Sequence, residues 1–231
     1  MNSVIRPSAA RGALALVLAC ACGASVARGA VQYGYDDGTG SVNIGPSFLG
    51  QMLWGNYFYT QSVGSVTQDT ITQVSVAFGN IAVGRSVTLC VFEDVDADGN
   101  PANAVLRATT SGLTDLPRTN TYINYNVSPM KITSGAFFVA ALVDIISTST
   151  GSTGDRPGRL DPQTNSGRSW YFADSVMNLN NIGGSPISLN MANNFIPGTW
   201  MVRATAIPGP ATGALLGLTA IGAGLRRRRR G

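Results

Sequence analysis

The sequence has no histidine, one lysine and one glutamate. Without histidine the chain cannot carry a Ser-His-Asp or Cys-His catalytic group, and most zinc sites are excluded as well. A serine–lysine pair could use only Lys131, and no spacing of the aspartates marks the paired carboxylates that a glycosidase needs. We therefore expect that the protein is not an enzyme.

Charge is scarce, and its two signs are separated along the chain. Charged residues make up 12% of the sequence, and the formal net charge is +4. Eight of the sixteen basic residues lie in the first 30 residues or in the C-terminal tail, whereas all twelve acidic residues lie in 31–206. The middle of the chain therefore has a net charge of −4 and lacks the basic stripe of a nucleic-acid-binding surface. We expect no nucleic-acid partner.

Residues 1–30 have the features of a secretory signal peptide. Two early arginines precede an apolar stretch at 13–22, which is too short to cross a bilayer as a helix. Small residues follow, and their spacing predicts cleavage by signal peptidase after Ala27 or Ala30. We expect an exported protein whose mature chain begins after one of these alanines.

Three cysteines are present, and only one lies in the middle of the chain. Cys20 and Cys22 belong to the predicted signal peptide, so Cys90 has no partner for an intramolecular disulfide. The apolar neighbours of Cys90 predict a small buried residue on a strand. An alternative for the N-terminus is a lipoprotein signal ending at Cys20, although Leu18 is bulky for such a signal.

Residues 207–231 form a third segment with its own composition. It contains the motif Pro208-Gly209-Pro210 and an uncharged apolar stretch at 211–225. As a helix this stretch would be about 22 Å long, shorter than a hydrocarbon core of about 30 Å, and the long arginines after it could extend its reach. We predict a short transmembrane helix followed by a basic cytoplasmic stop, which consists of Arg226, Arg227, Arg228, Arg229 and Arg230.

This C-terminal segment resembles the PEP-CTERM sorting signal, in which a proline motif precedes a small apolar helix and an arginine cluster. Gly209 stands where that family usually has glutamate. The resemblance implies processing by an exosortase-type transpeptidase. It also implies transient anchoring in the inner membrane, followed by attachment at the cell surface or release outside the cell.

Residues 31–206 are expected to form one all-β domain. Apolar and polar residues alternate in short runs that are separated by glycine and asparagine clusters, and no stretch keeps a helical period. We predict eight to ten strands in a two-sheet β-sandwich of jelly-roll type. The polar segment 147–167 is expected to be a strandless loop. The clearest strand candidates are 72–79, 85–93, 123–127, 136–146, 168–172 and 200–206.

Two short segments of this domain loosely resemble secreted bacterial β-sandwich proteins that have no assigned activity. They are the opening Tyr33–Thr39 and the later Gly167–Tyr171. Within the first, Asp36-Asp37-Gly38 predicts a turn, with a second metal contact as the alternative.

An acidic run carries the most specific local pattern. Asp94, Asp96, Asp98 and Asn100 alternate around a glycine as in the first half of an EF-type calcium loop, and oxygen ligands in such a turn can converge on one ion. Val105 stands where the bidentate glutamate would be, so Glu93 or a backbone carbonyl would have to complete the shell. Calcium binding by this loop and a solvated hairpin turn both remain open.

The domain could serve in one of two ways after export. The first is a structural or adhesive role at the cell envelope, which needs only stable export and display. The second is the recognition of an envelope or matrix polysaccharide by a glycan-binding module, for which aromatic rings could form a platform. Core packing is the simpler expectation for these rings, which belong to Trp54, Tyr57, Tyr59, Trp170, Tyr171 and Trp200.

Overall fold

The computed structural model describes residues 29–61, 68–148, 154–194 and 196–208. Within these ranges the chain is all β, as predicted. Ala27, Gly209, Pro210, the helix expected at 211–225 and the arginine tail lie outside the described residues. In the part of the chain that the structure describes, no helix is long and apolar enough to cross a bilayer.

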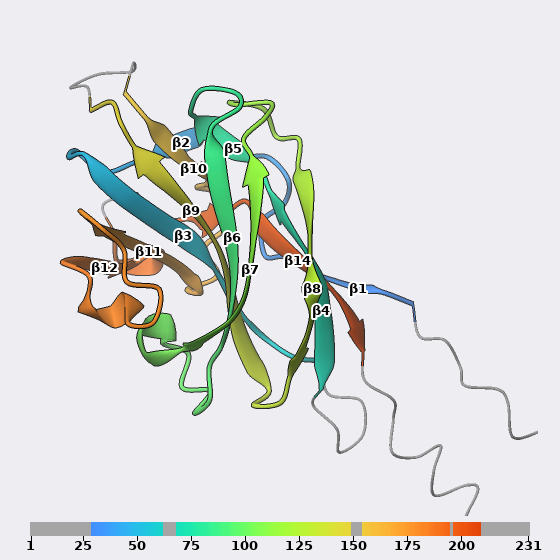
Figure 1. Ribbon diagram of the computed structural model, residues 1–231. Coiled ribbons are helices and arrows are strands. Elements are labelled where there is room, and N and C mark those ends of the chain that lie inside the picture. Colours follow the sequence, from blue (N-terminus) through green and yellow to red (C-terminus); the bar gives the residue numbers. More distant parts are fainter. Residues whose placement is uncertain (1–28, 62–67, 149–153, 195, 209–231) are drawn as a thin grey trace, which may run out of the picture.

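Fourteen strands and three single-turn 3-10 helices make up the described chain (Figure 1). The strands are β1 (Val31–Tyr33), β2 (Val42–Ile44), β3 (Gly50–Tyr59), β4 (Asp69–Val76), β5 (Phe78–Asn80), β6 (Ser86–Glu93), β7 (Val105–Leu113), β8 (Ile123–Ile132), β9 (Ala136–Ile145), β10 (Arg156–Asp161), β11 (Ser169–Asp174), β12 (Ile187–Asn190), β13 (Thr199–Trp200) and β14 (Val202–Pro208). The helices are η1 (Pro101–Asn103), η2 (Ile182–Gly184) and η3 (Met191–Asn193).

The strands form three antiparallel sheets, whereas the sequence predicted two. One sheet has the order β12-β11-β3-β9-β6-β7, and another has the order β1-β14-β4-β8. The third has the order β13-β10-β2, with β5 also paired to β10. The extra sheet arises because β4 passes into β5 at Ala77 and β13 passes into β14 at Met201. There the Ala77 N–H donates to the Met201 carbonyl oxygen at 3.0 Å, so that the second and third sheets share two bent chain segments.

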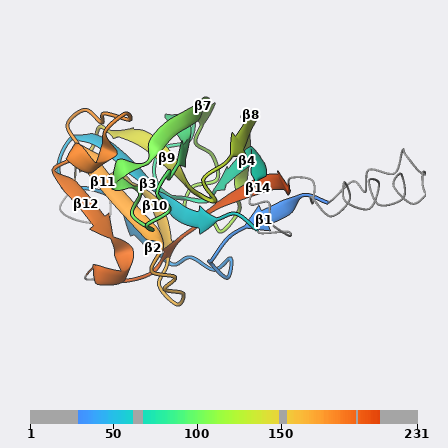
Figure 2. The same cartoon turned by 90° about the horizontal axis from the view of Figure 1, so that it is seen from below.

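The main hydrophobic core lies between the six-stranded sheet and the β1-β14-β4-β8 sheet. Trp54 and Phe137 from the first sheet and Val74 and Val202 from the second are fully buried in one cluster. β7 and β8, which lie at the facing edges of the two sheets, run beside each other (Figure 2). The apolar side chains that alternate along these strands therefore form a core between two layers. The jelly-roll topology remains a prediction.

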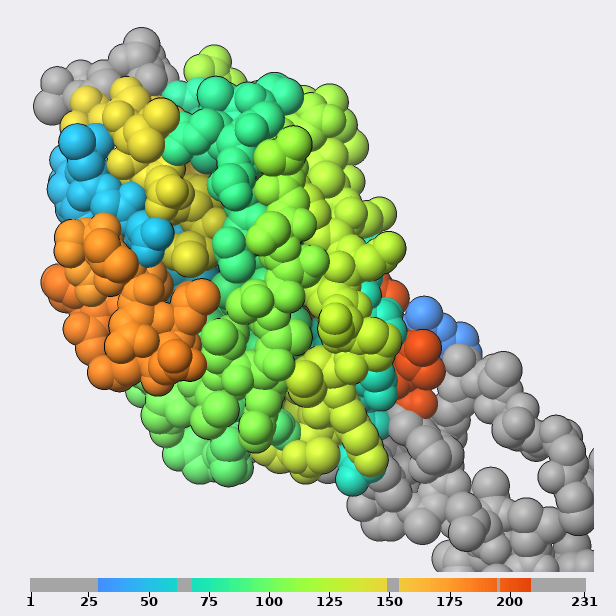
Figure 3. Space-filling model, in the orientation of Figure 1, coloured from blue at the N-terminus to red at the C-terminus, as the bar shows by residue number. Residues whose placement is uncertain are grey.

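A second hydrophobic cluster covers the other face of the six-stranded sheet. Tyr57, Cys90 and Phe138 are fully buried there under the loop at 94–104 and the segment at 174–194. Figure 3 shows the latter segment, in orange, beside β6 and β7 in green. Because β9 lies between two cores, almost every residue in it is buried.

Two local predictions about strands were wrong. The segment 147–167, which was expected to have no strand, contains β10. Pro157 and Gly158 within β10 are residues typical of turns, so the sequence did not indicate a strand there. Glycine is required at this point because a Cβ on residue 158 would lie 2.7 Å from the Trp200 ring. At the C-terminus the strand predicted at 200–206 extends two residues further, because β14 ends at Pro208, which still pairs with Asp69 of β4.

Candidate functional site

The acidic loop joins β6 to β7 as a long hairpin connection. Glu93 pairs with Val105, which closes the loop at its base. Positive φ angles occur at Ala97, at 54°, and at Gly99, at 90°, so the chain turns sharply between the aspartates. The flanking elements are the strands β6, which the sequence predicted, and β7, so the loop has the connectivity of a hairpin.

Three carboxylates meet inside this loop. One oxygen from each of Asp94, Asp96 and Asp98 lies within 4.8 Å of the others. Asp94, which directly follows β6, is fully buried, whereas Asp96 and Asp98 are exposed. The structure thus brings three of the four residues of the predicted site together, with Asp94 held at the end of a strand.

The buried carboxylate of Asp94 is only half satisfied. The Tyr57 hydroxyl of β3 donates to its Oδ2 at 2.7 Å, but its Oδ1 is buried without a hydrogen-bond partner. Burial raises the pKa of Asp94 despite the hydrogen bond from Tyr57, and the nearby carboxylates of Asp96 and Asp98 raise it further. A buried acceptor without a donor is costly, so this site favours a proton or a cation next to Asp94.

Asp96, the second carboxylate of the group, is exposed. The neighbouring Asp94 carboxyl lowers the pKa of Asp96, and the Asn103 Nδ2, which donates to the Asp96 Oδ2 at 2.9 Å, lowers it too. A cation placed between these carboxylates would relieve their mutual repulsion.

Two further residues considered as calcium ligands have other partners. The Asn100 Oδ1 accepts a hydrogen bond from the Ala102 N–H at 3.1 Å and so caps η1. Glu93 is turned away from the loop: it accepts hydrogen bonds from the N–H groups of Thr133 and Ser134 and pairs with Arg107 at 2.9 Å. Both roles depend on tertiary or capping geometry that the spacing of acidic residues does not reveal.

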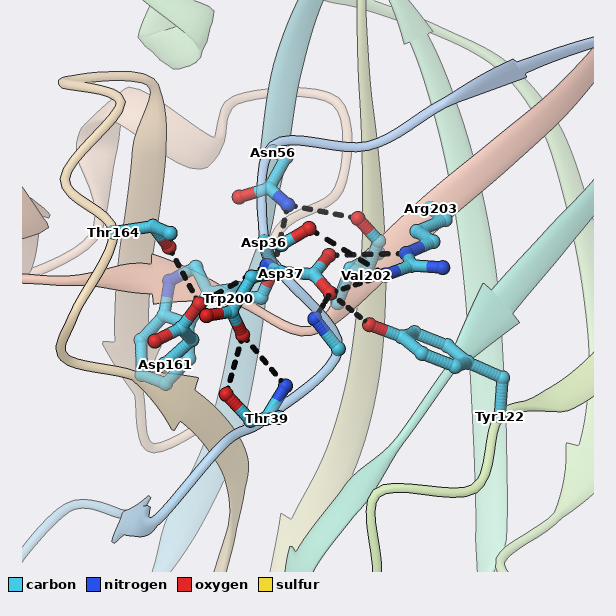
Figure 4. Close-up of polar contacts among 11 residues, drawn as sticks. Asp36, Asp37, Thr39, Asn56, Tyr122, Asp161, Thr164, Trp200, Val202 and Arg203 are labelled. Atoms are coloured by element: carbon cyan, nitrogen blue, oxygen red, sulfur yellow. Dashed lines mark hydrogen bonds and ion pairs between the residues drawn. The ribbon is translucent and has the colours of Figure 1, made fainter.

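A second polar cluster lies where the loop after β1 meets β10 and β14 (Figure 4). Asp36 pairs with Arg203 and also accepts a hydrogen bond from the Tyr122 hydroxyl. Asp161 is fully buried and accepts hydrogen bonds from the Asp37 N–H at 3.2 Å and from the Thr164 hydroxyl at 2.7 Å. These carboxylates have protein partners, and Asp36 and Asp37 also form the predicted turn by accepting from backbone N–H groups two residues later.

Most of the aromatic candidates for a sugar platform are core residues, which agrees with the expectation that their rings pack in the core. Trp54, Tyr57 and Trp200 have no exposed surface, whereas Tyr59 is 40% exposed. The Arg168 guanidinium lies over the Tyr59 ring, 4.6 Å from its centroid. Of the six candidates, Tyr171 is also buried, Trp170 is half-buried, and Tyr59 is the one that is exposed.

Comparison with known proteins gives no family for this chain. No family model matches the sequence, and no match was found among the curated proteins. A solved structure of the clostridial cysteine protease Cwp84 after propeptide cleavage is 13% identical and has a TM-score of 0.49, over 78% of this chain and 40% of that one. The cysteine protease and lectin-like domains of Cwp84, a surface-layer-associated protein of Clostridium difficile, are 12% identical with a TM-score of 0.44, over 78% of this chain and 36% of that one.

Proposed function

We propose that this chain is an exported bacterial protein whose β domain is displayed at the cell surface in a structural or adhesive role. The observation that carries the proposal is the pairing of β1 with β14, in which Val31 lies opposite Ala206. The first and last strands of the domain therefore lie side by side (Figure 1). The predicted signal peptide and the predicted sorting segment both attach at this one end.

This arrangement suits display from a membrane. A domain held at one end keeps its other surfaces clear of the bilayer, and the net charge of −4 on 31–206 disfavours adsorption onto anionic lipids. In this proposal the domain is a β-sandwich of jelly-roll type, the apolar segment at 211–225 anchors it in the inner membrane, and the exosortase-type enzyme later removes that anchor. The domain itself is not catalytic.

Cell fractionation with mass spectrometry of the mature protein tests the proposal. We expect a chain that begins after Ala27 or Ala30, has lost its arginine tail and is found in the surface or extracellular fraction. Replacing all five arginines at 226–230 with glutamine should disturb anchoring and processing, whereas Lys131→Gln on the exposed side of β8 should not. Recovery of the intact chain, soluble inside the cell with both ends present, would contradict the proposal.

Glycan binding is the second candidate, and Tyr59 is the residue that favours it. The residue is 40% exposed and the Arg168 guanidinium lies over its ring, so a sugar could stack on the ring or accept hydrogen bonds from the guanidinium. A pull-down with envelope polysaccharide should then depend on Tyr59. Equal retention of the wild-type chain and Tyr59→Ala would remove this candidate without affecting the display proposal.

A further inference from the structure

We propose that the loop between β6 and β7 binds one calcium ion through the carboxylates of Asp94, Asp96 and Asp98, and that the ion fixes this loop over the second hydrophobic cluster. The proposal is independent of the export route and concerns the folded domain alone. It rests on two observations, the convergence of the three carboxylates and the unsatisfied oxygen of Asp94.

The first observation concerns charge. The three carboxylate oxygens lie within 4.8 Å of one another. The ion pairs within the described ranges join Arg85 to Asp155, Arg107 to Glu93 and Arg203 to Asp36, so none of them neutralises this group. A divalent cation at the point where the carboxylates converge would replace their mutual repulsion with attraction.

The second observation separates this loop from an ordinary acidic surface turn. Asp94 is fully buried, and its Oδ1 has no hydrogen-bond partner. Buried polar atoms in folded proteins nearly always have a partner, and an orphaned carboxylate oxygen is especially costly. An ion held between Asp94 and the two exposed aspartates would supply the missing partner.

The donor set favours calcium over other ions. All three side chains offer oxygen, and the sequence has no histidine to attract zinc or copper. Asp96 and Asp98 lie on an exposed loop, which can adapt to the large and irregular shell of calcium more easily than to the strict octahedron of magnesium. Water would occupy the remaining positions on the solvent side.

The acidic loop contacts the segments that lie over the second hydrophobic cluster. The ion would therefore stabilise these segments as well as its own ligands. Asp96 accepts a hydrogen bond from Asn103 at the end of η1. Ala102 in η1 lies against η2, where a Cβ on residue 183 would be 2.7 Å from the Ala102 carbonyl oxygen. Through Tyr57, Asp94 is also joined to β3. Calcium would therefore hold η1, and with it the covering loop, against the six-stranded sheet.

Thermal unfolding of the full-length chain in mild detergent, with chelator or with calcium, is the first test. With three carboxylates and an open solvent side, we expect an affinity typical of extracellular calcium modules, so that 10 mM calcium should raise the Tm by about 3–10 °C. Magnesium at the same concentration should have a smaller effect. Terbium should also show luminescence sensitised by the nearby Tyr57 ring. An unchanged Tm in 10 mM calcium would overturn the proposal.

Variants give the test its specificity. Asp98→Asn keeps an acceptor for the Asn100 N–H but should lose the calcium response. Asp94→Asn should raise the Tm in chelator, because it removes a buried negative charge, and should also abolish the response to calcium. Asp115→Asn, an exposed aspartate in another turn, is the matched control and should respond as the wild type does. An undiminished calcium response in Asp94→Asn would contradict the proposed ligands.

Peptide-resolved hydrogen exchange tests whether calcium stabilises the loop over the second hydrophobic cluster. Calcium should slow exchange in peptides from 95–104 in the wild type and leave Asp98→Asn unchanged. A rise in Tm without slower exchange in these peptides would place the ion elsewhere and refute the structural role of this loop. Neither result depends on where the protein is exported.

Discussion

Asp36 and Arg203 form a two-point ion pair that ties the loop after β1 to β14. The Arg203 Nη2 lies 2.6 Å from the Asp36 Oδ1, and its Nε lies 3.1 Å from Oδ2. The guanidinium also lies over the Tyr122 ring, 4.3 Å from the centroid. The Asp36 side chain is fully buried, whereas Arg203 is 21% exposed. The pair secures the N-terminal end of the domain against the strand that leads to the C-terminal segment.

Arg203→Met should destabilise the domain because it leaves a buried carboxylate without its cation. We expect the free energy of unfolding to fall by about 3 kcal/mol, the lower part of the range for breaking a buried pair, since Arg203 is partly solvated. Urea denaturation followed by tryptophan fluorescence would measure it. Lys131→Met, an exposed change on β8, should alter stability by less than about 0.5 kcal/mol. Equal effects of the two changes would argue against a structural role for the pair.

Gly112→Ala should weaken the contact between β7 and β8. A Cβ at this position would lie 2.3 Å from the Tyr125 Cε1, so the ring would have to move. Overpacking of this kind costs about 1–3 kcal/mol, and the hydrogen bond from the Tyr125 hydroxyl to the Leu113 carbonyl oxygen should weaken as well. Thermal unfolding would measure the loss. Ser111→Ala, exposed on the same strand, is the control, and a stable Gly112→Ala would mean that the strands can separate without cost.

The Cys90 thiol should be inert in the folded protein even at alkaline pH. It is fully buried, and burial raises the pKa of this thiol to about 12. Iodoacetamide at pH 9 should therefore label Cys90 only after unfolding, and peptide mapping would distinguish it from Cys20 and Cys22. Because the folded domain holds this proton more tightly than the unfolded chain, Cys90 makes the free energy of unfolding fall as the pH rises above its ordinary pKa. Rapid labelling under native conditions would contradict the covered second cluster.

Asn100→Ala should distinguish a helix cap from a calcium ligand. Its side chain accepts from the Ala102 N–H, so its loss should cost about 1 kcal/mol in stability. As a cap, the residue should give the same loss in calcium and in chelator. A loss seen only in calcium would instead return Asn100 to the set of ligands that the sequence predicted. Asn193→Ala, at the exposed end of η3, is a suitable control.

The local pattern of apolar residues predicted those strands whose own side chains are mostly apolar. The apolar run at 136–146 predicted a strand, and the neighbours of Cys90 predicted its burial; both are confirmed. The pattern failed at β10, where Pro157 and Gly158 look like turn residues. There the decisive contact is with Trp200, which lies some forty residues away in the chain.

By itself, the sequence determined the all-β class of the described domain and the convergence of Asp94, Asp96 and Asp98. These features follow from side-chain alternation and from the short reach of a single loop. Only the tertiary structure decided the third sheet, the second core and the orphaned oxygen of Asp94. They depend on partners that are distant in sequence: Tyr57 reaches Asp94 across 37 residues, and Arg203 reaches Asp36 across 167. A local sequence pattern cannot indicate such partners, because residues this far apart in sequence come into contact only in the folded domain.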